Sequence, residues 1–212
     1  MPSSSRLLPA LAWANVILHG LGLAVAWFGM RPGSVVVPLA ERMAYLAGNP
    51  PGWTWGWGIF MLCTLLLVAY MAVLRSLIPG RPLAALLALV FTASGMAVDL
   101  LCDVIQIQAL PLAAQAGPAD PGLFLVLERL AFTGGATVAN GLYTLGVLLM
   151  TLCLRNLVGA PARYAGWATA VSGFAMVLAG LLLSPELLQA STGPTLGFYS
   201  LWTVLVARDL SS

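Results

Sequence analysis

The stretch LAALLALVFTASGMAVDLLCDVIQIQ, residues 83–108, decides the fold class of this chain. Its only charged side chains are Asp99 and Asp103. A bilayer crossing needs about 20 predominantly apolar residues, and backbone polar groups in lipid must be hydrogen-bonded within the segment itself. The stretch is therefore predicted to be a membrane-spanning α-helix.

Composition extends this prediction to the whole chain. Of the 212 residues, 60% are hydrophobic and 8% are charged, whereas a soluble domain carries about 25% charged residues. So few charges could not cover a water-facing surface. The short alternating segments of a membrane β-barrel are not seen. The sequence predicts an all-α, polytopic membrane protein forming a single membrane domain over residues 1–212, without a cleavable signal peptide.

Six apolar stretches predict a bundle of six transmembrane helices. Their approximate bounds are residues 8–28, 56–74, 83–108, 123–154, 164–183 and 195–207. The fourth is too long for one simple crossing, so residues 123–133 are expected to form an outer extension, with a bend or close packing at Gly134 and Gly135. A short surface helix is expected within residues 35–47, and a loop over residues 111–122.

The arginines orient the helices, because cytoplasmic loops of membrane proteins are enriched in basic residues. All nine basic residues are arginines. With the N-terminus inside, the outer loops hold only Arg31 and Arg42, and Arg129 lies in the outer part of the fourth helix. The inner segments then hold Arg6, Arg75, Arg81, Arg155, Arg163 and Arg208. Both termini are therefore predicted to be cytoplasmic.

Polar residues inside membrane helices are costly and mark candidate functional sites. One such group is predicted at similar depth on the third and fourth helices. It comprises Asp99, Asp103, Glu128 and Arg129; Gln106 shares the helix face of the two aspartates, and Asn140 and Tyr143 share a stripe of the fourth helix with Arg129. We expect Arg129 to pair with Asp103 in a pocket that opens outward, while Asp99 stays free to bind a proton or a ligand. A salt bridge with a purely structural role is the alternative.

The first helix carries a second polar pair, Asn15 and His19, one turn apart. These side chains are expected to form interhelical hydrogen bonds or, alternatively, a proton relay. A single histidine excludes bis-histidine haem within one chain, and the absence of lysine excludes Schiff-base chemistry. The DLLCD segment, residues 99–103, has the DxxxD spacing of Mg²⁺-binding prenyl-diphosphate enzymes but no second acidic motif. No cofactor, metal site or nucleic-acid partner is predicted.

Glycines recur every seven residues on the fifth helix, at Gly166, Gly173 and Gly180. Small residues allow membrane helices to approach closely. The stripe predicts either a packing seam within the bundle or the interface of a homo-oligomer.

The last third of the chain has a familiar pattern. The segments RNLVGAPARYAGWATAVSGFAMVLAGLLL (155–183) and LWTVLVARDL (201–210) resemble a broad family of uncharacterised bacterial six-helix membrane proteins, through Pro161, Arg163, Trp167 and Trp202. The resemblance implies a multi-pass protein of the bacterial inner membrane and supplies no activity.

Three functions are compatible with these features. The first is a small transporter, or a membrane protein that binds a small-molecule or lipid-like substrate, using the outer polar group. The second is a membrane-embedded enzyme acting on a lipid or isoprenoid. The third is a non-catalytic accessory subunit. Membrane lipids are expected partners in each case.

Overall fold

The computed structural model describes residues 4–48, 50–78 and 80–211, and these residues form helices joined by short turns, with no strand among them. Side chains are described from Leu7 onward. The α-helices are α1 (Ser4–Val25), α2 (Leu39–Ala47), α3 (Pro51–Ser76), α4 (Pro82–Val104), α5 (Leu110–Ala114), α6 (Gly122–Thr133), α7 (Asn140–Leu154), α8 (Ala160–Leu182) and α9 (Pro185–Ser211). The π-helical segments are η1 (Ala26–Met30), η3 (Ile105–Ala109) and η4 (Gly134–Ala139), and η2 (Arg31–Gly33) is a 3₁₀ turn.

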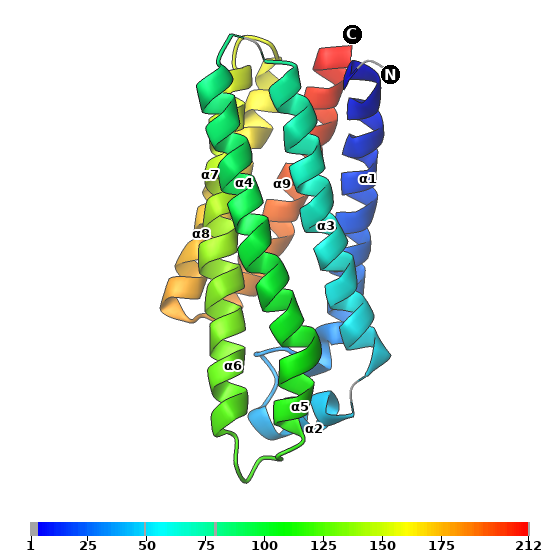
Figure 1. Ribbon diagram of the computed structural model, residues 1–212, viewed down its shortest axis with the longest axis vertical. Helices are drawn as coiled ribbons and strands as arrows, with labels where there is room; N and C mark the ends of the chain where they lie inside the picture. Colours follow the sequence, from blue (N-terminus) through cyan, green and yellow to red (C-terminus); the bar gives the residue numbers. More distant parts are fainter. Residues whose placement is uncertain (1–3, 49, 79, 212) are drawn as a thin grey trace.

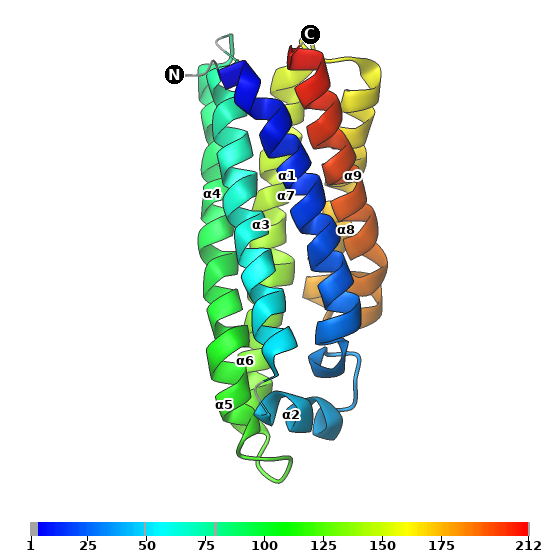
Figure 2. The ribbon, with the colours of Figure 1, turned by 90° about the vertical axis from the view of Figure 1, so that its right-hand side faces the viewer.

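The long helices form a closed ring in which successive helices run in opposite directions along the molecule (Figures 1 and 2). Each packs against its neighbour in sequence, in the order α1, α3, α4, α7, α8 and α9, and α9 closes the ring against α1. Both termini lie at one end, here called the termini end, and the opposite end is called the distal end. The largest buried side chains of the ring include Tyr70 and Trp202, and the Tyr70 hydroxyl crosses it to donate to the Thr203 carbonyl.

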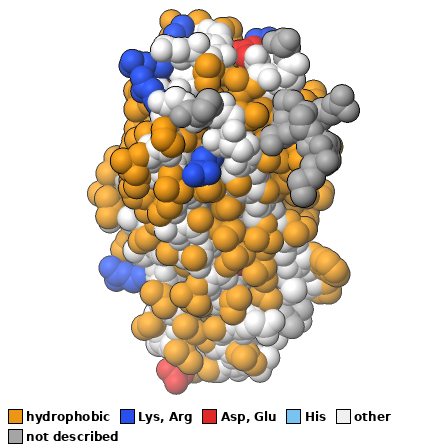
Figure 3. Space-filling model, turned by 45° about the horizontal axis from the view of Figure 1, so that its top comes forward, with side chains coloured by type: hydrophobic (Ala, Val, Ile, Leu, Met, Phe, Trp, Pro, Cys, Tyr) orange, Lys and Arg blue, Asp and Glu red, His pale blue; other side chains and the backbone are white. Residues whose placement is uncertain are grey.

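Within the described residues, five helical segments are long and apolar enough to cross a membrane. They are Leu7–Gly33, Pro51–Ser76, Pro82–Ala114, Gly122–Leu154 and Ala160–Leu182. Large apolar side chains such as Val171 and Leu181 point outward, and hydrophobic side chains dominate the face in Figure 3. These features fit an integral membrane protein that exposes its apolar surface to lipid.

The sixth helix, α9, is longer than the expected residues 195–207 and less apolar than the other five. The expected start at residue 195 lies directly after Gly193 and Pro194. The helix instead passes through Pro194, and the hydroxyls of Ser191 and Thr195 bond back to carbonyls of the preceding turn. Such polar side chains lower the hydropathy of the segment, so its sequence does not indicate a long apolar span. Because their hydroxyls bond to carbonyls of their own helix, the helix stays intact.

Other boundaries differ because proline can occupy the first turn of a helix, where its missing N–H is not needed. α3 starts at Pro51, ahead of the expected residue 56, and α8 starts at Ala160 with Pro161 in its first turn. The expected loop over 111–122 is shorter, because the helical path continues through η3 and α5 to Ala114. The extension expected over residues 123–133 corresponds to α6, the π-helical segment η4 begins at Gly134, and Gly134 packs closely on the Cys102 side chain.

The glycine stripe of α8 is a packing seam within the chain. A side chain at Gly173 would collide with the Thr144 hydroxyl. Gly166 faces Thr151 and Gly180 faces Thr137 in the same way, so two seven-residue repeats oppose each other across α7 and α8. The stripe is buried, so it offers no free face for a second copy of the chain.

The distal end carries a second small core, here called the distal cap. Its buried residues come from η1, α2, α3, α5 and α6: Met30, Met43, Leu46, Trp53, Leu110, Ala113, Ala114 and Phe124. A short helix, as expected within residues 35–47, is present as α2, and it packs on α5. Hydrogen bonds from Tyr45 to the Gly29 carbonyl and from Trp53 to the Gln106 carbonyl join the cap to the helix ends.

Candidate functional site

The distal half of α4 carries the two intramembrane acids, one helical turn apart. Residues separated by four positions share a helix face, so Asp99 and Asp103 both lie toward neighbouring helices. Asp103 is buried, with 1% of its surface exposed, and Asp99 is half-buried. Gln106, the third predicted residue of this face, lies in η3, and its backbone carbonyl accepts the Trp53 indole N–H.

Asp99 is bonded across the bundle to α7. The Tyr143 hydroxyl donates a hydrogen bond of 3.1 Å to Asp99 Oδ2, and Thr64 on α3 lies beside the same hydroxyl. Gly95 makes this arrangement possible, because a Cβ there would stand 2.9 Å from the Tyr143 ring and 3.0 Å from the Ala139 carbonyl. Gly95 was not among the predicted site residues. Its position one turn before Asp99, on the same helix face, could have indicated that another helix approaches closely there.

Asp103 has no hydrogen-bond or ion-pair partner among the described residues. Five buried side-chain atoms in the described part of the chain lack a partner, namely Trp57 Nε1, Asp103 Oδ2, Thr137 Oγ1, Thr151 Oγ1 and Trp202 Nε1. Asp103 is the only acid among them. Buried polar atoms in native proteins are nearly always paired, and an exception calls for an explanation such as a bound ion, a water or a functional role.

Two π-helical segments flank the acids. η3 starts two residues after Asp103, and η4 passes Asp99, whose Oδ1 lies 3.8 Å from the position of a Cβ on Gly135. Asn140, another predicted residue, donates to the Gly135 carbonyl in η4. π-helical turns appear frequently at functional sites, because they release backbone groups from the regular ladder.

The expected pairing of Arg129 with Asp103 or Asp99 is wrong. Arg129 is exposed and forms no ion pair with any described residue, since the only pairs found within 4.0 Å join Arg42 to Glu128 and Arg208 to Asp209. Two physical reasons account for the error. Cys102 lies level with Gly134, so Arg129 stands more than one turn further toward the distal end than Asp103.

The second reason concerns direction around α6. Glu128 is buried and points toward α2, where Arg42 donates to both of its carboxylate oxygens at 2.7 Å. Consecutive residues point about 100° apart around a helix, so Arg129 points out of the bundle. The acidic site is therefore left without a cation from the described residues, and the predicted polar group divides into an Asp99–Asp103–Tyr143 site and an Arg42–Glu128 pair.

Asn15 and His19 belong to a separate polar contact between α1 and α9. Tyr199 donates a hydrogen bond of 3.0 Å to Asn15 Oδ1, and the His19 and Tyr199 rings meet edge to face with centroids 5.2 Å apart. His19 Nδ1 lies 2.8 Å from the Asn15 carbonyl. The interhelical hydrogen bond expected of Asn15 is confirmed.

The three cysteines, Cys63, Cys102 and Cys153, are free and buried. Cys63 and Cys102 stand near both aspartates, close enough for the charges to interact. No group of three or more His, Cys, Asp or Glu side chains within the described ranges is close enough to hold a metal ion.

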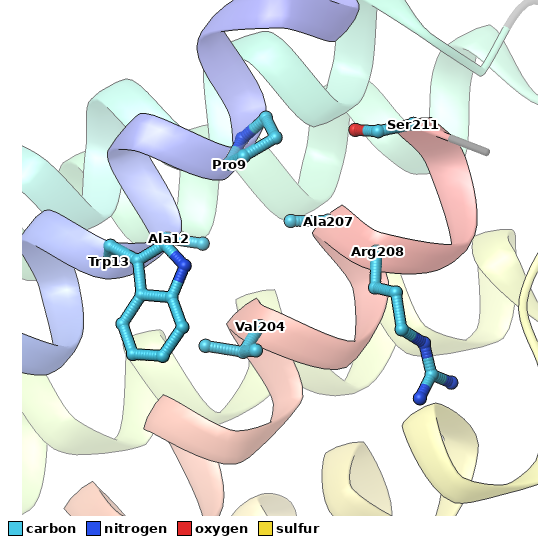
Figure 4. A pocket seen from close by; sticks show the side chains of 7 residues that line it. All are labelled: Pro9, Ala12, Trp13, Val204, Ala207, Arg208 and Ser211. Atoms are coloured by element: carbon cyan, nitrogen blue, oxygen red, sulfur yellow. The ribbon is translucent and has the colours of Figure 1, made fainter.

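Surface grooves occur at both ends of the molecule. One, of about 260 Å³, lies at the termini end between α1 and α9, and Figure 4 shows it bordered by Trp13 and Arg208. The other, of about 340 Å³, lies toward the distal end and is lined by α6 and the turn between α8 and α9, with Arg129 among its residues.

Comparison of the chain with protein-family models, with curated proteins and with solved structures finds no match in any of the three. The resemblance of the last third to bacterial six-helix membrane proteins therefore stays a prediction, and the fold and the site are argued from the chain's own residues.

Proposed function

We propose that the chain is a six-span protein of a bacterial inner membrane with both termini in the cytoplasm. The helical ring supports α9 as the sixth crossing, because it runs beside α1 and α8 and ends at the termini end. Arg75, Arg81, Arg155, Arg163 and Arg208 occupy that end, as the positive-inside rule requires of a cytoplasmic face. Reporter fusions after residue 211 and in the 115–121 loop test the orientation, and a periplasmic C-terminal signal contradicts it.

We propose further that the protein is a small transporter whose Asp99–Asp103–Tyr143 site exchanges a proton for a small organic cation. A single observation carries the proposal: Asp103 is an acid buried inside the bundle without any partner among the described residues. A bare carboxylate in a low-dielectric interior costs several kcal/mol. The site therefore needs either a proton on Asp103 or a positive charge beside it.

The surroundings of Asp103 favour exchange over a fixed structural role. Asp99 stands one turn away, so two like charges would repel each other unless a proton or a cation separates them. The nearest helix interruptions, η3 and η4, lie beside these two acids. Intramembrane acids that face the bundle interior commonly mark ion and substrate pathways.

Proteoliposomes carrying an imposed pH gradient test this function. With purified protein, ethidium serves as the organic cation and an entrapped pH dye reports proton movement. We expect ethidium flux coupled to opposite proton flux, and loss of both in Asp103→Asn. The exposed Asp120→Asn is the matched control and keeps both fluxes. Wild-type protein that binds neither a proton nor ethidium at Asp103 contradicts the proposal and favours the accessory-subunit alternative.

A second readout separates proton binding from transport. Infrared spectra of the purified protein over a pH titration report the carbonyl band of a protonated carboxylic acid, and substitution of each aspartate assigns it. We expect a band that responds to ethidium and disappears in Asp103→Asn. An enzyme acting on a lipid or isoprenoid would instead turn over its substrate, and none of the contacts described above favours that alternative.

A further inference from the structure

The distal groove combines apolar walls with one uncompensated positive charge. Val35, Leu125, Phe132 and Leu183 supply apolar surface, and Arg129 lies among them on α6. The walls come from three parts of the chain: the segment before α2, α6, and the turn between α8 and α9. The groove lies outside the acidic site, because Arg129 points away from the aspartates.

The acids around this groove do not neutralise Arg129. Glu128 is bound by Arg42, and Glu186 accepts a hydrogen bond from the Ser184 hydroxyl. Neither forms an ion pair with Arg129 within the described residues. Arg129 is thus exposed in the groove without an ion pair to any described residue, so its guanidinium is available to an anion, and the apolar walls are suited to a hydrocarbon segment.

The depth of Arg129 matches the headgroup layer of a bilayer. Arg129 and Arg155 lie near opposite ends of the α6–η4–α7 rod, about 39 Å apart by helical rise. A bilayer with its headgroup regions is about 40–45 Å thick. Leu181 and Leu182, exposed by 65% and 63%, precede the turn that lines the groove. A bilayer that holds Arg155 in one headgroup layer would therefore hold Arg129, and with it the groove, in the opposite headgroup layer next to the acyl chains.

We propose that this groove binds an anionic phospholipid, with its phosphate on the Arg129 guanidinium and the first part of one acyl chain against Leu125, Phe132 and Leu183. The planar fork of arginine matches the oxygens of a phosphate and binds it through charge-assisted hydrogen bonds. The groove at the termini end differs in this respect, because Arg208 is already paired with Asp209 at 2.8 Å.

Lipid retention in detergent tests the proposal. The probe is dioctanoyl phosphatidylglycerol, and native mass spectrometry and the melting temperature report its binding. We expect Arg129→Gln to weaken retention about fivefold, the equivalent of about 1 kcal/mol for one basic residue near a lipid surface. Arg129→Lys keeps most of the binding. Arg31→Gln is the matched control, because Arg31 is exposed at the same end and covers the Trp27 ring.

Two further arms separate a lipid from a free anion or a bare apolar contact. Dioctanoyl glycerol lacks the phosphate, and inorganic phosphate lacks the chains, so each should protect the protein less than the phospholipid does. Leu125→Ser, at a position 40% exposed, should weaken phospholipid retention without unfolding the protein. Unchanged retention in Arg129→Gln, equal loss in Arg31→Gln, or equal protection by inorganic phosphate overturns the proposal.

Discussion

The Arg42 guanidinium donates two hydrogen bonds of 2.7 Å to the two carboxylate oxygens of Glu128, 86 residues further along the chain. A third bond from Arg42 to the Val37 carbonyl fixes the start of α2. The two side chains are only 12% and 11% exposed. This pair therefore holds the distal cap against α6.

Substitution Arg42→Ala is expected to destabilise the cap strongly, because Glu128 would be left as an unpaired and nearly buried charge. Removing one partner of such a pair costs about 2–3 kcal/mol, near the lower end of the range for fully buried pairs. The melting temperature in detergent and proteolysis at residues 34–38 measure the effect. The double variant Arg42→Ala/Glu128→Ala should recover part of the loss. A single variant as stable as the wild type would show that the pair contributes nothing.

The helical architecture was predictable from the sequence, whereas the partners of its charged residues were not. Apolar stretches near or above bilayer length predict helices, because lipid satisfies no backbone hydrogen bonds. The surface helix α2 was expected, but nothing local indicates that its Arg42 reaches Glu128. Such a contact depends on how the connection folds back, which spacing along one helix cannot predict. The predicted pairing of Arg129 was wrong in both depth and direction, because Arg129 lies further toward the distal end than Asp103 and points out of the bundle.

The glycine stripe of α8 predicts a position-specific packing effect. Gly173→Ala should destabilise the bundle by about 1–3 kcal/mol, the usual range for overpacking a tight interior, because the new methyl group would meet the Thr144 hydroxyl. Gly197→Ala on α9 is the matched control, since its surroundings are open to at least 4 Å. There the change should be neutral or slightly stabilising through helix propensity. Equal melting temperatures for the two variants would show that the seam tolerates extra volume.

The contact between the start of α8 and the end of α9, at the termini end, predicts that the stability of the protein depends on pH. Asp209 accepts a hydrogen bond of 2.8 Å from the N–H of Gly159, the residue directly before α8. This bond, with a smaller effect from Arg208, lowers the pKa of Asp209 below its usual range. The resulting stabilisation is fully present above the unfolded pKa of about 3.9 and is lost as the pH falls through the lower folded pKa.

Asp209→Asn should therefore lower the melting temperature slightly near neutral pH, by the equivalent of at most about 0.5 kcal/mol for a half-buried group at the end of the bundle. The difference from the wild type should shrink as the pH drops below about 4, since both proteins then lack the charge. Melting curves over a pH series measure it. A difference that persists unchanged at acid pH would assign the effect to something other than the carboxylate.

The last prediction separates a working acid from a structural one at Asp103. An unpartnered carboxyl in the interior is a burden on stability, and replacing such a group by an apolar side chain of similar volume is commonly neutral or stabilising. Asp103→Leu should therefore keep or raise the melting temperature in detergent while abolishing ethidium-coupled proton flux. Asp99 differs, because Asp99→Leu would leave the Tyr143 hydroxyl without its 3.1 Å acceptor and should cost about 1 kcal/mol of stability.

Tyr143→Phe completes the comparison, since it removes the same hydrogen bond from the other side and leaves Asp103 in place. Its loss of stability should be of the same order as that of Asp99→Leu, about 1 kcal/mol, because each variant removes this one interhelical bond. Its flux should fall only in part, since the exchanging acid remains. Unfolding of Asp103→Leu, with Tyr143→Phe still folded, would contradict this prediction. Asp103 would then have a structural role in helix packing, and proton exchange would not be its function.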